Sequence, residues 1–394
     1  MKILVLTSEF DPYRGGIGTY AREIALAATK LGHDVTLVAP DYLADQTEAD
    51  KIFPFAVRRY PGKTPSWSKL PERIRLVRAI ARSERFDCVH AADWPFYLPL
   101  ALSSFRRKAG CVVTFHGSEI NFMRHPRRSI PVALSRFWNG WADYVANSRF
   151  TAEHLLRTFP QVPREKVRAV PLGVNESWLR GAVDRAWARD QLQIPEDRFV
   201  LVSLGRITPR KGHMIVCEAL ARLPPDISRR IEWRIVGPSL EEDYAAKLRQ
   251  AIADSKVNAK FDGVLSQSAI EILLSAADAF CLPGFWDDKQ QFEGFGLVYL
   301  EAAALGVPSI GTNSGGVPDA IRDGETGLLV PPNDAAAVAE AIRFLFENPG
   351  KRKALAAGAR AHAEASSWTC VAKATYRDVN PSGRMRDEYV SERV

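Results

Sequence analysis

Short apolar runs alternate with amphipathic stretches along nearly the whole chain, as expected where parallel strands alternate with helices. In the first half, the apolar runs predict strands at 2–7, 34–39, 56–60, 87–91, 111–116, 143–147 and 167–171. The stretches between them predict helices, and in 17–31 one face gathers Tyr20, Ile24, Ala27, Ala28 and Leu31. The fold class of this half is therefore α/β with a parallel sheet.

The second half repeats the alternation. Its apolar runs predict strands at 199–205, 232–237, 260–264, 279–283, 309–312 and 327–330. Its amphipathic stretches predict helices at 212–223, 240–254, 267–276 and 296–305, with further helices to about 379. Residues 175–197 show no strand pattern and are expected to link the halves. Since doubly wound sheets bind ligands at the carboxyl ends of their strands, two such domains facing across a cleft are expected.

Composition narrows the class of protein. Hydrophobic residues make up 46% and charged residues 25% of the chain, which excludes wholesale disorder. No apolar stretch approaches the roughly 18 residues that a membrane span needs, and neither a span nor a signal peptide is expected. The five cysteines lie far apart in apolar contexts, so we expect reduced core residues of a cytoplasmic protein and no metal site.

Charge is distributed unevenly. Residues 1–180 hold 27 Lys or Arg against 17 Asp or Glu, whereas residues 181–394 hold 26 against 29. A basic half can serve nucleic acid, an anionic membrane surface or a phosphorylated ligand, or only keep the chain soluble. The basic positions singled out are Arg73, Arg75, Arg78, Arg82, Arg106, Arg107, Lys108, Arg127 and Arg128. No aromatic-basic interleaving accompanies them, so a membrane surface is expected and nucleic acid is not.

The segment FEGFGLVYLEAAALGVPSIGTNSGGVPDAI, residues 292–321, is the most informative part of the sequence. Glu293 and Glu301 stand eight residues apart, which places the second carboxylate about two turns into a predicted helix and roughly 12 Å from the first. Two carboxylates so spaced cannot share one proton or metal, but they can grip the two ends of an elongated ligand. Alternatively, Glu293 caps the helix and Glu301 is only solvated.

The start of this helix favours a diphosphate. The amides of Phe295, Gly296 and Leu297 lie at the helix N-terminus, where free N–H groups and the helix dipole attract anions. Glycine at 294 and 296 lets the backbone approach a ligand closely.

A basic segment, SLGRITPRKGH at 203–213, follows a predicted strand. Arg206, Arg210 and Lys211 therefore lie at the carboxyl edge of the second sheet, where they can clamp phosphate oxygens and stabilise a leaving diphosphate. The alternative is a basic loop that is merely solvated.

The N-terminal segment RGGIGTYA places Gly15, Gly16 and Gly18 before a helix. It formally matches the dinucleotide-binding pattern, but eight residues separate Leu6 at the strand end from the first glycine. A glycine loop that reaches a ligand fits better than a Rossmann phosphate turn.

Polar residues end two further strands of the first half. His116, in VVTFHGSE, is placed where it can touch substrate, although a lone histidine is often only part of the core or surface. Asn147 and Ser148 end the next strand, and they can instead cap the helix that follows.

Taken together, these segments resemble the retaining glycosyltransferases of family 4, which have the two-domain GT-B fold. The matching segments are GGIGTY, FHGSE, ANSRFT, VPLGVN, LVSLGRITPRKG, FDGVLS, EGFGLVYLEAAALGVPSIGTNSGGVPDAI and TGLLVPP. The resemblance implies transfer of a hexose from a UDP- or GDP-sugar to an acceptor hydroxyl, with retention at the anomeric carbon. It requires neither a cofactor nor a metal.

The resemblance also implies residue roles. Arg206 and Lys211 would hold the donor diphosphate, and Glu293 would contact the hexose hydroxyls. Glu301 would bind the ribose, and His116 would contact the sugar near the reacting centre. The remaining donor contacts would come from Gly16 at the phosphates, Gly263, Val264 and Leu265 at the base, and the backbone of Phe295, Gly296 and Leu297 at the phosphates and sugar.

The expected domains are 1–185 for acceptor binding and 186–370 for the nucleotide sugar, with a helix in 371–394 packing back on the first domain. The loop at 284–292, which contains Asp287 and Asp288, either shapes the sugar pocket, contacts acceptor or is a surface insert. Its carboxylates leave a metal formally open.

The expected function is hexosyl transfer to a sugar or lipid-linked acceptor in polysaccharide, lipopolysaccharide or glycolipid synthesis. The enzyme would be cytoplasmic and peripheral on the inner face of the membrane. A nucleotide-sugar isomerase or epimerase of the same architecture is the first alternative, and a dinucleotide-dependent oxidoreductase is the second.

Overall fold

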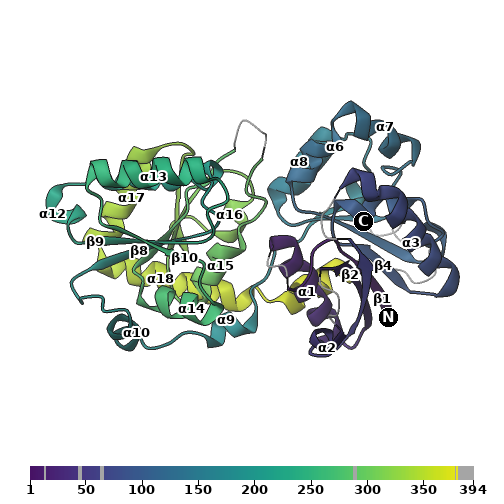
Figure 1. Cartoon of the computed structure of the whole chain (residues 1–394), viewed down its shortest axis with the longest axis horizontal. Coiled ribbons are helices and arrows are strands. Elements are labelled where there is room, and N and C mark those ends of the chain that lie inside the picture. The colour runs from purple at the N-terminus through teal and green to yellow at the C-terminus, as the bar shows by residue number, and fades with distance from the viewer. Residues whose placement is uncertain (13–14, 43–46, 63–65, 287–290, 378, 380–394) are drawn as a thin grey trace, which may run out of the picture. The chain divides into compact units, whose positions relative to one another are not determined.

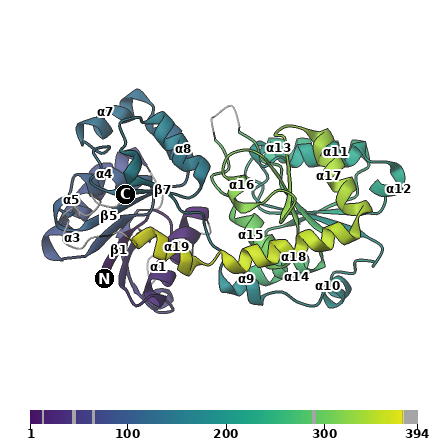
Figure 2. The same cartoon turned by 180° about the vertical axis from the view of Figure 1, so that it is seen from behind.

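The computed structural model of the chain describes residues 1–12, 15–42, 47–62, 66–286, 291–377 and 379. The chain forms two compact units, unit 1 from Met1–Val170 and Trp368–Val394, and unit 2 from Pro171–Ser367 (Figures 1 and 2). Each unit holds one parallel sheet with helices on both faces, so the predicted pair of doubly wound α/β domains is confirmed.

The unit boundaries differ from the expected ones. Unit 1 ends at Val170 instead of 185, and the chain returns to it at Trp368 instead of 371. The expected linker, 175–197, contains the helices α9 (Glu176–Arg180) and α10 (Arg185–Gln191), and the latter packs on α14 (Gln267–Ala276) of unit 2. Absence of a strand pattern therefore reflected short helices and not an unstructured connection.

The strands of unit 1 follow the order β3-β2-β1-β4-β5-β6-β7. Their bounds are β1 Lys2–Leu6, β2 Asp34–Asp41, β3 Ala56–Pro61, β4 Cys88–Ala91, β5 Gly110–Phe115, β6 Asp143–Ala146 and β7 Val167–Ala169. The helices are α1 Gly16–Lys30, α2 Thr47–Asp50, α3 Leu70–Ser83, α4 Tyr97–Ala101, α5 Phe105–Lys108, α6 Ser118–Met123, α7 Pro126–Leu134, α8 Arg149–Thr158 and α19 Trp368–Tyr376. All seven predicted strands are confirmed, with ends shifted by one or two residues.

Alternating side chains of the unit 1 sheet meet different helices. Leu4 and Leu6 belong to a buried cluster that includes Val77 and Ile80 of α3. The opposite face is covered by α1 and α19, which pack on each other. The part of the expected helix 371–394 that the structure describes is the end of α19, which lies on unit 1 although α1 and α19 are far apart in sequence. Residues 378 and 380–394 lie outside the described ranges.

The strands of unit 2 follow the order β10-β9-β8-β11-β12-β13. Their bounds are β8 Phe199–Leu204, β9 Ile231–Val236, β10 Ala259–Gly263, β11 Ala279–Cys281, β12 Ser309–Thr312 and β13 Gly327–Val330. The remaining helices are α11 His213–Arg222, α12 Pro225–Ser228, α13 Glu242–Ser255, α15 Leu297–Ala304, α16 Val317–Ala320, α17 Ala335–Glu347 and α18 Pro349–Ala365. Figures 1 and 2 show α13 and α17 on one side of this sheet and α14 and α18 on the other.

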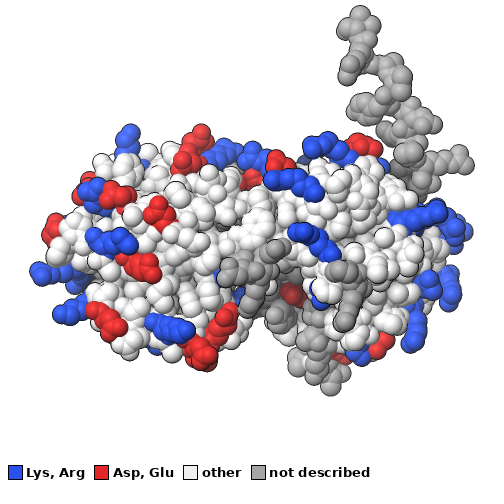
Figure 3. All heavy atoms as spheres, turned by 90° about the horizontal axis from the view of Figure 1, so that it is seen from above, with Lys and Arg blue, Asp and Glu red and all other residues white. Residues whose placement is uncertain are grey.

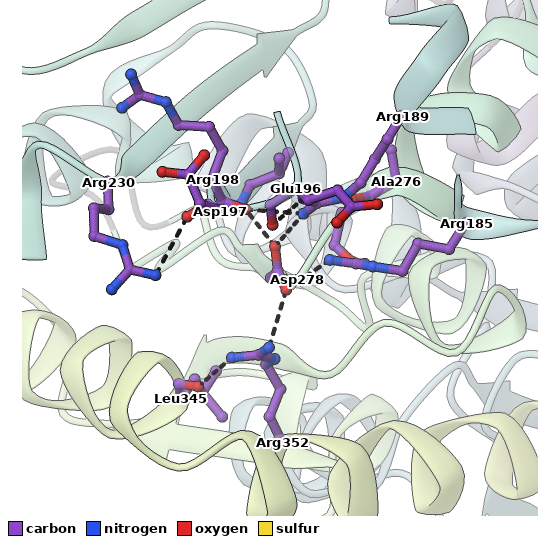
Figure 4. A network of polar contacts seen from close by, with 12 residues as sticks. Arg185, Arg189, Glu196, Asp197, Arg198, Arg230, Ala276, Asp278, Leu345 and Arg352 are labelled. Carbon is purple, nitrogen blue, oxygen red and sulfur yellow. Dashed lines mark hydrogen bonds and ion pairs between the residues drawn. The ribbon is translucent and has the colours of Figure 1, made fainter. Parts of the chain in front are cut away.

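An arginine cluster at the amino end of β11 ties α10 and α18 to the unit 2 sheet (Figure 4). The carboxylate of Asp278 accepts from Arg189 at 2.7 Å, from Arg185 at 2.8 Å and from the amide of Val200 at 2.9 Å, and Arg352 lies 3.2 Å away. Arg189 is buried and also donates to four backbone carbonyls, those of Ala276, Pro195, Glu196 and Arg198. Because the polar groups of Asp278 and Arg189 are bonded to other groups of the protein, we assign this cluster a structural role.

Replacing Asp278 with Asn should destabilise unit 2 by about 3 kcal/mol, because the buried Arg189 would lose its counter-charge. Urea-induced unfolding measures the loss. Glu340→Gln is the matched control, since the exposed pair Glu340–Arg343 is a surface salt bridge whose removal should leave stability almost unchanged. Equal stability of the Asp278→Asn variant and the native chain would contradict a structural role for the cluster.

Candidate active site

A buried ion pair joins two of the predicted site residues at the carboxyl edge of the unit 2 sheet. Lys211 follows β8 in a 3-10 turn (Pro209–Lys211), and Glu293 precedes α15. Lys211 Nζ donates to Glu293 Oε2 at 2.5 Å, and Arg210 donates to the same oxygen at 3.3 Å. No described residue bonds to Oε1 of Glu293, so one oxygen of this carboxylate is open to a ligand.

The electrostatics of this triplet fix the charge of Glu293. Burial alone would raise the pKa of Glu293, but the charges of Lys211 and Arg210 lower it to about 2. Burial lowers the pKa of Lys211, and the carboxylate opposes that shift. Glu293 therefore remains an anion at neutral pH, which suits an acceptor of hydroxyl hydrogen bonds and not a proton acceptor.

Backbone contacts hold both partners of the pair. The carbonyl of Glu293 accepts from the amide of Gly316 at 2.8 Å, and the amide of Lys211 donates to the carbonyl of Thr208 at 3.1 Å. Gly315 has φ +60°, and a Cβ atom there would lie 2.4 Å from the carbonyl oxygen of Glu293. Only glycine fits at this position, so the segment SGG after β12 supports the site, a role that the sequence alone did not indicate.

The helix that follows Glu293 begins later than predicted. Gly296 is the N-cap of α15 with φ +90°, so the capping alternative for Glu293 is wrong. The amides of Phe295, Gly296 and Leu297 donate to no other described residue. Three successive free N–H groups at a helix start form a cradle for an anion, as the sequence predicted.

The ring of Tyr299, in the first turn of α15, packs against the backbone at the start of this helix. Tyr299 is buried and donates to the carbonyl of Leu282 at 2.6 Å. A Cβ atom on Gly296 would lie 2.5 Å from the Tyr299 ring, which explains the glycine. The sequence offers a weak signal for this support, an aromatic residue three positions after the glycine.

Glu301 lies just over one turn into α15, closer to its start than the two turns expected. Burial raises its pKa to about 7, and it has no hydrogen-bond or ion-pair partner in the part of the chain that the structure describes. An unpartnered carboxyl group this close to a free helix start is available to the hydroxyl groups of a ligand.

The other predicted donor residues of unit 2 are accessible. Arg206 is exposed in the loop after β8. Gly263 ends β10 with φ +66°, its carbonyl accepts from Gly237 at 2.8 Å, and Val264 beside it is 74% exposed. Leu265 is partly buried. None of these four residues forms a hydrogen bond or ion pair with Lys211 or Glu293, although the charge of Arg206 acts on Lys211.

In unit 1, the predicted His116 lies at the carboxyl end of β5. Its Nε2 donates to the carbonyl of Ala92 at 2.8 Å, and its ring packs edge-on against Tyr20 of α1 with centroids 4.9 Å apart. The Nδ1 atom bonds to no described residue and can accept from a ligand. Tyr20 was not predicted as a site residue, although it stands in the GIGTYA segment.

Other unit 1 expectations have mixed outcomes. Gly16 starts α1, it is exposed, and an added Cβ would meet no atom within 4 Å, so packing does not explain a glycine here. Ser148 caps α8 by accepting from Thr151 at 3.1 Å, and Asn147 donates to the carbonyl of His116 at 3.1 Å. The capping alternative is thus confirmed for Ser148.

Some expectations concern metals, cysteines and membrane spans. Within the described ranges, no three His, Cys, Asp or Glu side chains group as metal ligands, and Asp287 and Asp288 lie outside those ranges. Four cysteines are buried, whereas Cys370 is exposed on α19 and is not the core residue expected. No helix among the described residues is long and apolar enough to cross a membrane.

Two family models match the chain in succession. The model for Glycosyltransferase Family 4 matches residues 14–178, and the model for Glycosyl transferases group 1 matches residues 184–362. Both models describe glycosyltransferases, and the chain belongs to glycosyltransferase group 1/family 4. It is a hexosyltransferase that uses a nucleotide sugar.

Relatives and solved structures agree with the family. A GDP-mannose-dependent monoacylated alpha-(1-6)-phosphatidylinositol monomannoside mannosyltransferase of Corynebacterium glutamicum is 29% identical, covering 93% of this chain and 94% of the relative. A D-inositol 3-phosphate glycosyltransferase of Streptomyces bingchenggensis is 36% identical over 60% of this chain and 52% of the relative.

Two solved structures share the fold. Anabaena Alr3699/HepE in complex with UDP is 22% identical with a TM-score of 0.78, covering 96% of this chain and 99% of that one. WaaG, a glycosyltransferase involved in lipopolysaccharide biosynthesis, is 19% identical with a TM-score of 0.69, covering 95% and 99%. The GT-B class predicted from the sequence is confirmed.

The raised pKa of Glu301 predicts a pH-dependent stability. Unfolding returns the pKa of this carboxyl group from about 7 to 4.5, so the folded state loses stability relative to the unfolded state as pH rises from 4.5 to 7. The variant Glu301→Gln cannot ionise at this position. Its melting temperature should therefore exceed that of the native chain by an amount that grows as the pH rises over this range. Thermal melts across pH measure the difference, with the exposed Glu347→Gln as control. A constant difference would contradict the burial of this carboxyl group.

Proposed function

We propose that the chain transfers a hexose from a UDP- or GDP-sugar to an acceptor hydroxyl with retention of configuration at the anomeric carbon. The observation that carries this proposal is the set of polar groups left open around Glu293: one carboxylate oxygen, three backbone amides and the free carboxyl group of Glu301. Together they match the hydroxyl groups and the diphosphate of a nucleotide sugar.

The donor would be held by charge and by hydrogen bonds to its two sugars. Arg206, Lys211 and the amides of 295–297 would bind the diphosphate, and Glu293 would accept from the hexose hydroxyls. Glu301 would accept from the ribose hydroxyls. The base would lie against the segment 263–265, whose exposed Val264 offers an apolar surface.

Catalysis in this scheme rests on positioning and on stabilising the leaving diphosphate. The acceptor hydroxyl attacks the anomeric carbon on the face from which the diphosphate departs. The bond from that carbon to the diphosphate breaks, negative charge grows on the diphosphate, and the hydroxyl proton passes to the departing phosphate oxygen. Lys211 and the helix start are held in place before the reaction, so they stabilise that charge without reorganising. From unit 1, Gly16 would contact the phosphates of the donor and His116 would contact its sugar.

Replacing Lys211 with Met, which keeps the apolar stem, should lower turnover by about 10²–10³-fold because the leaving diphosphate loses a fixed cation. UDP and GDP should also raise the melting temperature of the variant less than that of the native chain. Turnover is measured as donor consumption. Lys256→Met is the control, because Lys256 is exposed at the end of α13. Unchanged turnover in the Lys211 variant would remove the residue from the mechanism.

A basic surface of unit 1 supports a lipid-linked acceptor at an anionic membrane. We define the α3–α5 surface as the exposed residues Arg75, Arg78, Arg82, Arg107 and Lys108; α3 and α5 both pack on α4. Figure 3 shows basic side chains predominating over unit 1 on the face in view, while both signs mix over unit 2. Arg73 is buried and bonds to the carbonyl of Ser66, so it does not belong to this surface, contrary to expectation.

The chain should co-sediment with anionic vesicles at low salt. It should remain in the supernatant at high salt, because salt screens the attraction between exposed charges. Changing Arg75, Arg78 and Arg82 together to Gln should weaken binding by about 1 kcal/mol per residue. The control variant carries three changes in unit 2, Arg222, Lys351 and Lys353 to Gln, all at exposed positions. Equal binding by the two triple variants would show that the α3–α5 surface is not the contact.

A further inference from the structure

Three aromatic side chains of unit 1 form a cluster that lies outside the residues assigned so far. The rings of Trp94 and Phe122 lie 4.9 Å apart, those of Trp67 and Trp94 lie 5.7 Å apart, and those of Trp67 and Phe122 lie 6.2 Å apart. All three are only partly buried and pack on the edge of the unit 1 core. We call Trp67, Trp94 and Phe122 the aromatic cluster.

The cluster is assembled at the carboxyl edge of the sheet. Trp67 follows β3, Trp94 follows β4, and Phe122 lies in α6 after β5. The same two central connections carry His116 and its partner, the carbonyl of Ala92. The aromatic cluster therefore shares its loops with the unit 1 residue proposed to contact substrate, at the edge where parallel sheets bind ligands.

The polar atoms of the cluster are not used within the described chain. Neither Trp67 nor Trp94 donates its indole N–H to a described residue, and neither nitrogen is among the buried atoms that lack a partner, so both reach solvent. Trp141, elsewhere in unit 1, donates its indole N–H to the carbonyl of Phe137 at 2.7 Å. A buried tryptophan usually finds such a partner, whereas these two indoles keep their N–H groups open to solvent and so to a ligand.

A cation completes the cluster. The guanidinium of Arg128 lies 3.4 Å from the centre of the Phe122 ring and donates to the Phe122 carbonyl at 3.2 Å. No other described acceptor bonds to it. The carboxylates on the segments that carry Trp94 and Phe122 have partners of their own, since Asp93 accepts from Ser8 and Glu119 accepts from the amide of His116. Arg128 thus presents free N–H donors beside exposed aromatic faces.

We propose that the aromatic cluster and Arg128 bind the acceptor, and that the acceptor part bound there is a polyhydroxylated six-membered ring carrying an anionic group. The C–H face of such a ring stacks on an indole. Its hydroxyl oxygens accept hydrogen bonds from the N–H groups of the two indoles, and its anionic group forms an ion pair with Arg128. This inference rests on the proposed hexosyl transfer, because it names the class of acceptor. The ring is either a free sugar phosphate or the headgroup of a lipid.

The experiment titrates the full chain with probes and follows tryptophan fluorescence. Glucose 6-phosphate represents the free ligand, with methyl α-glucoside and inorganic phosphate as its matched halves. Phosphatidylinositol vesicles represent the lipid headgroup, with phosphatidylglycerol vesicles as an equally anionic surface that lacks the ring. We expect saturable quenching by glucose 6-phosphate or by phosphatidylinositol vesicles that exceeds the quenching by the matched probes.

Variants assign this binding to the cluster, and calorimetric titration measures their affinities because the double variant lacks the indoles that report by fluorescence. The double variant Trp67→Leu with Trp94→Leu keeps apolar volume, removes both indoles and should bind the positive probe roughly tenfold more weakly. Arg128→Gln should weaken that probe but leave the neutral glucoside unaffected. Trp141→Leu is the matched control and should bind like the native chain. Should the double variant fold poorly by circular dichroism, Trp67→Leu alone carries the test.

Two results would overturn the inference: no probe binds better than its matched control, or the double variant binds as tightly as the native chain. UDP and GDP thermal shifts on the same samples separate this outcome from failure of the proposed function. Nucleotide binding without probe binding rejects only the aromatic cluster as the acceptor site. Absence of any nucleotide shift would instead reject the proposed hexosyl transfer.

Discussion

The ion pair between Lys211 and Glu293 is the contact on which the proposed donor site depends. Its partners come from segments 82 residues apart, one after β8 and one before α15, and both side chains are largely withdrawn from water. A buried carboxylate would ordinarily take up a proton, but two cations hold this one ionised. The pair thereby fixes both the position of a cation and the charge of an anion before any ligand arrives.

Unit 2 contains two charged clusters at opposite ends of its sheet, and their hydrogen bonds distinguish their roles. At the amino end, Asp278 and Arg189 have partners for nearly every polar atom, which is typical of a structural network. At the carboxyl end, Glu301 and the amides that begin α15 have none among the described residues. Open polar groups gathered at one edge of a sheet point to a ligand, because buried groups are otherwise satisfied.

Unit 1 shows how distant segments support a site residue. His90 of β4 bonds to Tyr376 of α19 at 2.9 Å and to Thr114 of β5 at 2.7 Å, and Thr114 also bonds to Tyr20 at 2.9 Å. Tyr20 in turn packs against His116. The C-terminal helix is therefore part of the packing that orients the carboxyl edge of the unit 1 sheet, and both the His116 region and the aromatic cluster stand on that edge.

The sequence by itself determined the secondary structure, the two sheets and the glycosyltransferase class, because hydrophobic periodicity and the segments around Glu293 are local signals. It also placed Lys211 and Glu293 at strand and helix ends. It did not reveal that Arg73 turns inward, that 175–197 folds as helices on unit 2, or that Trp67, Trp94 and Phe122 meet. Those facts depend on which strands become neighbours and which face each helix covers. Such contacts join residues far apart in sequence, so the local hydrophobic periodicity of one sequence does not predict them.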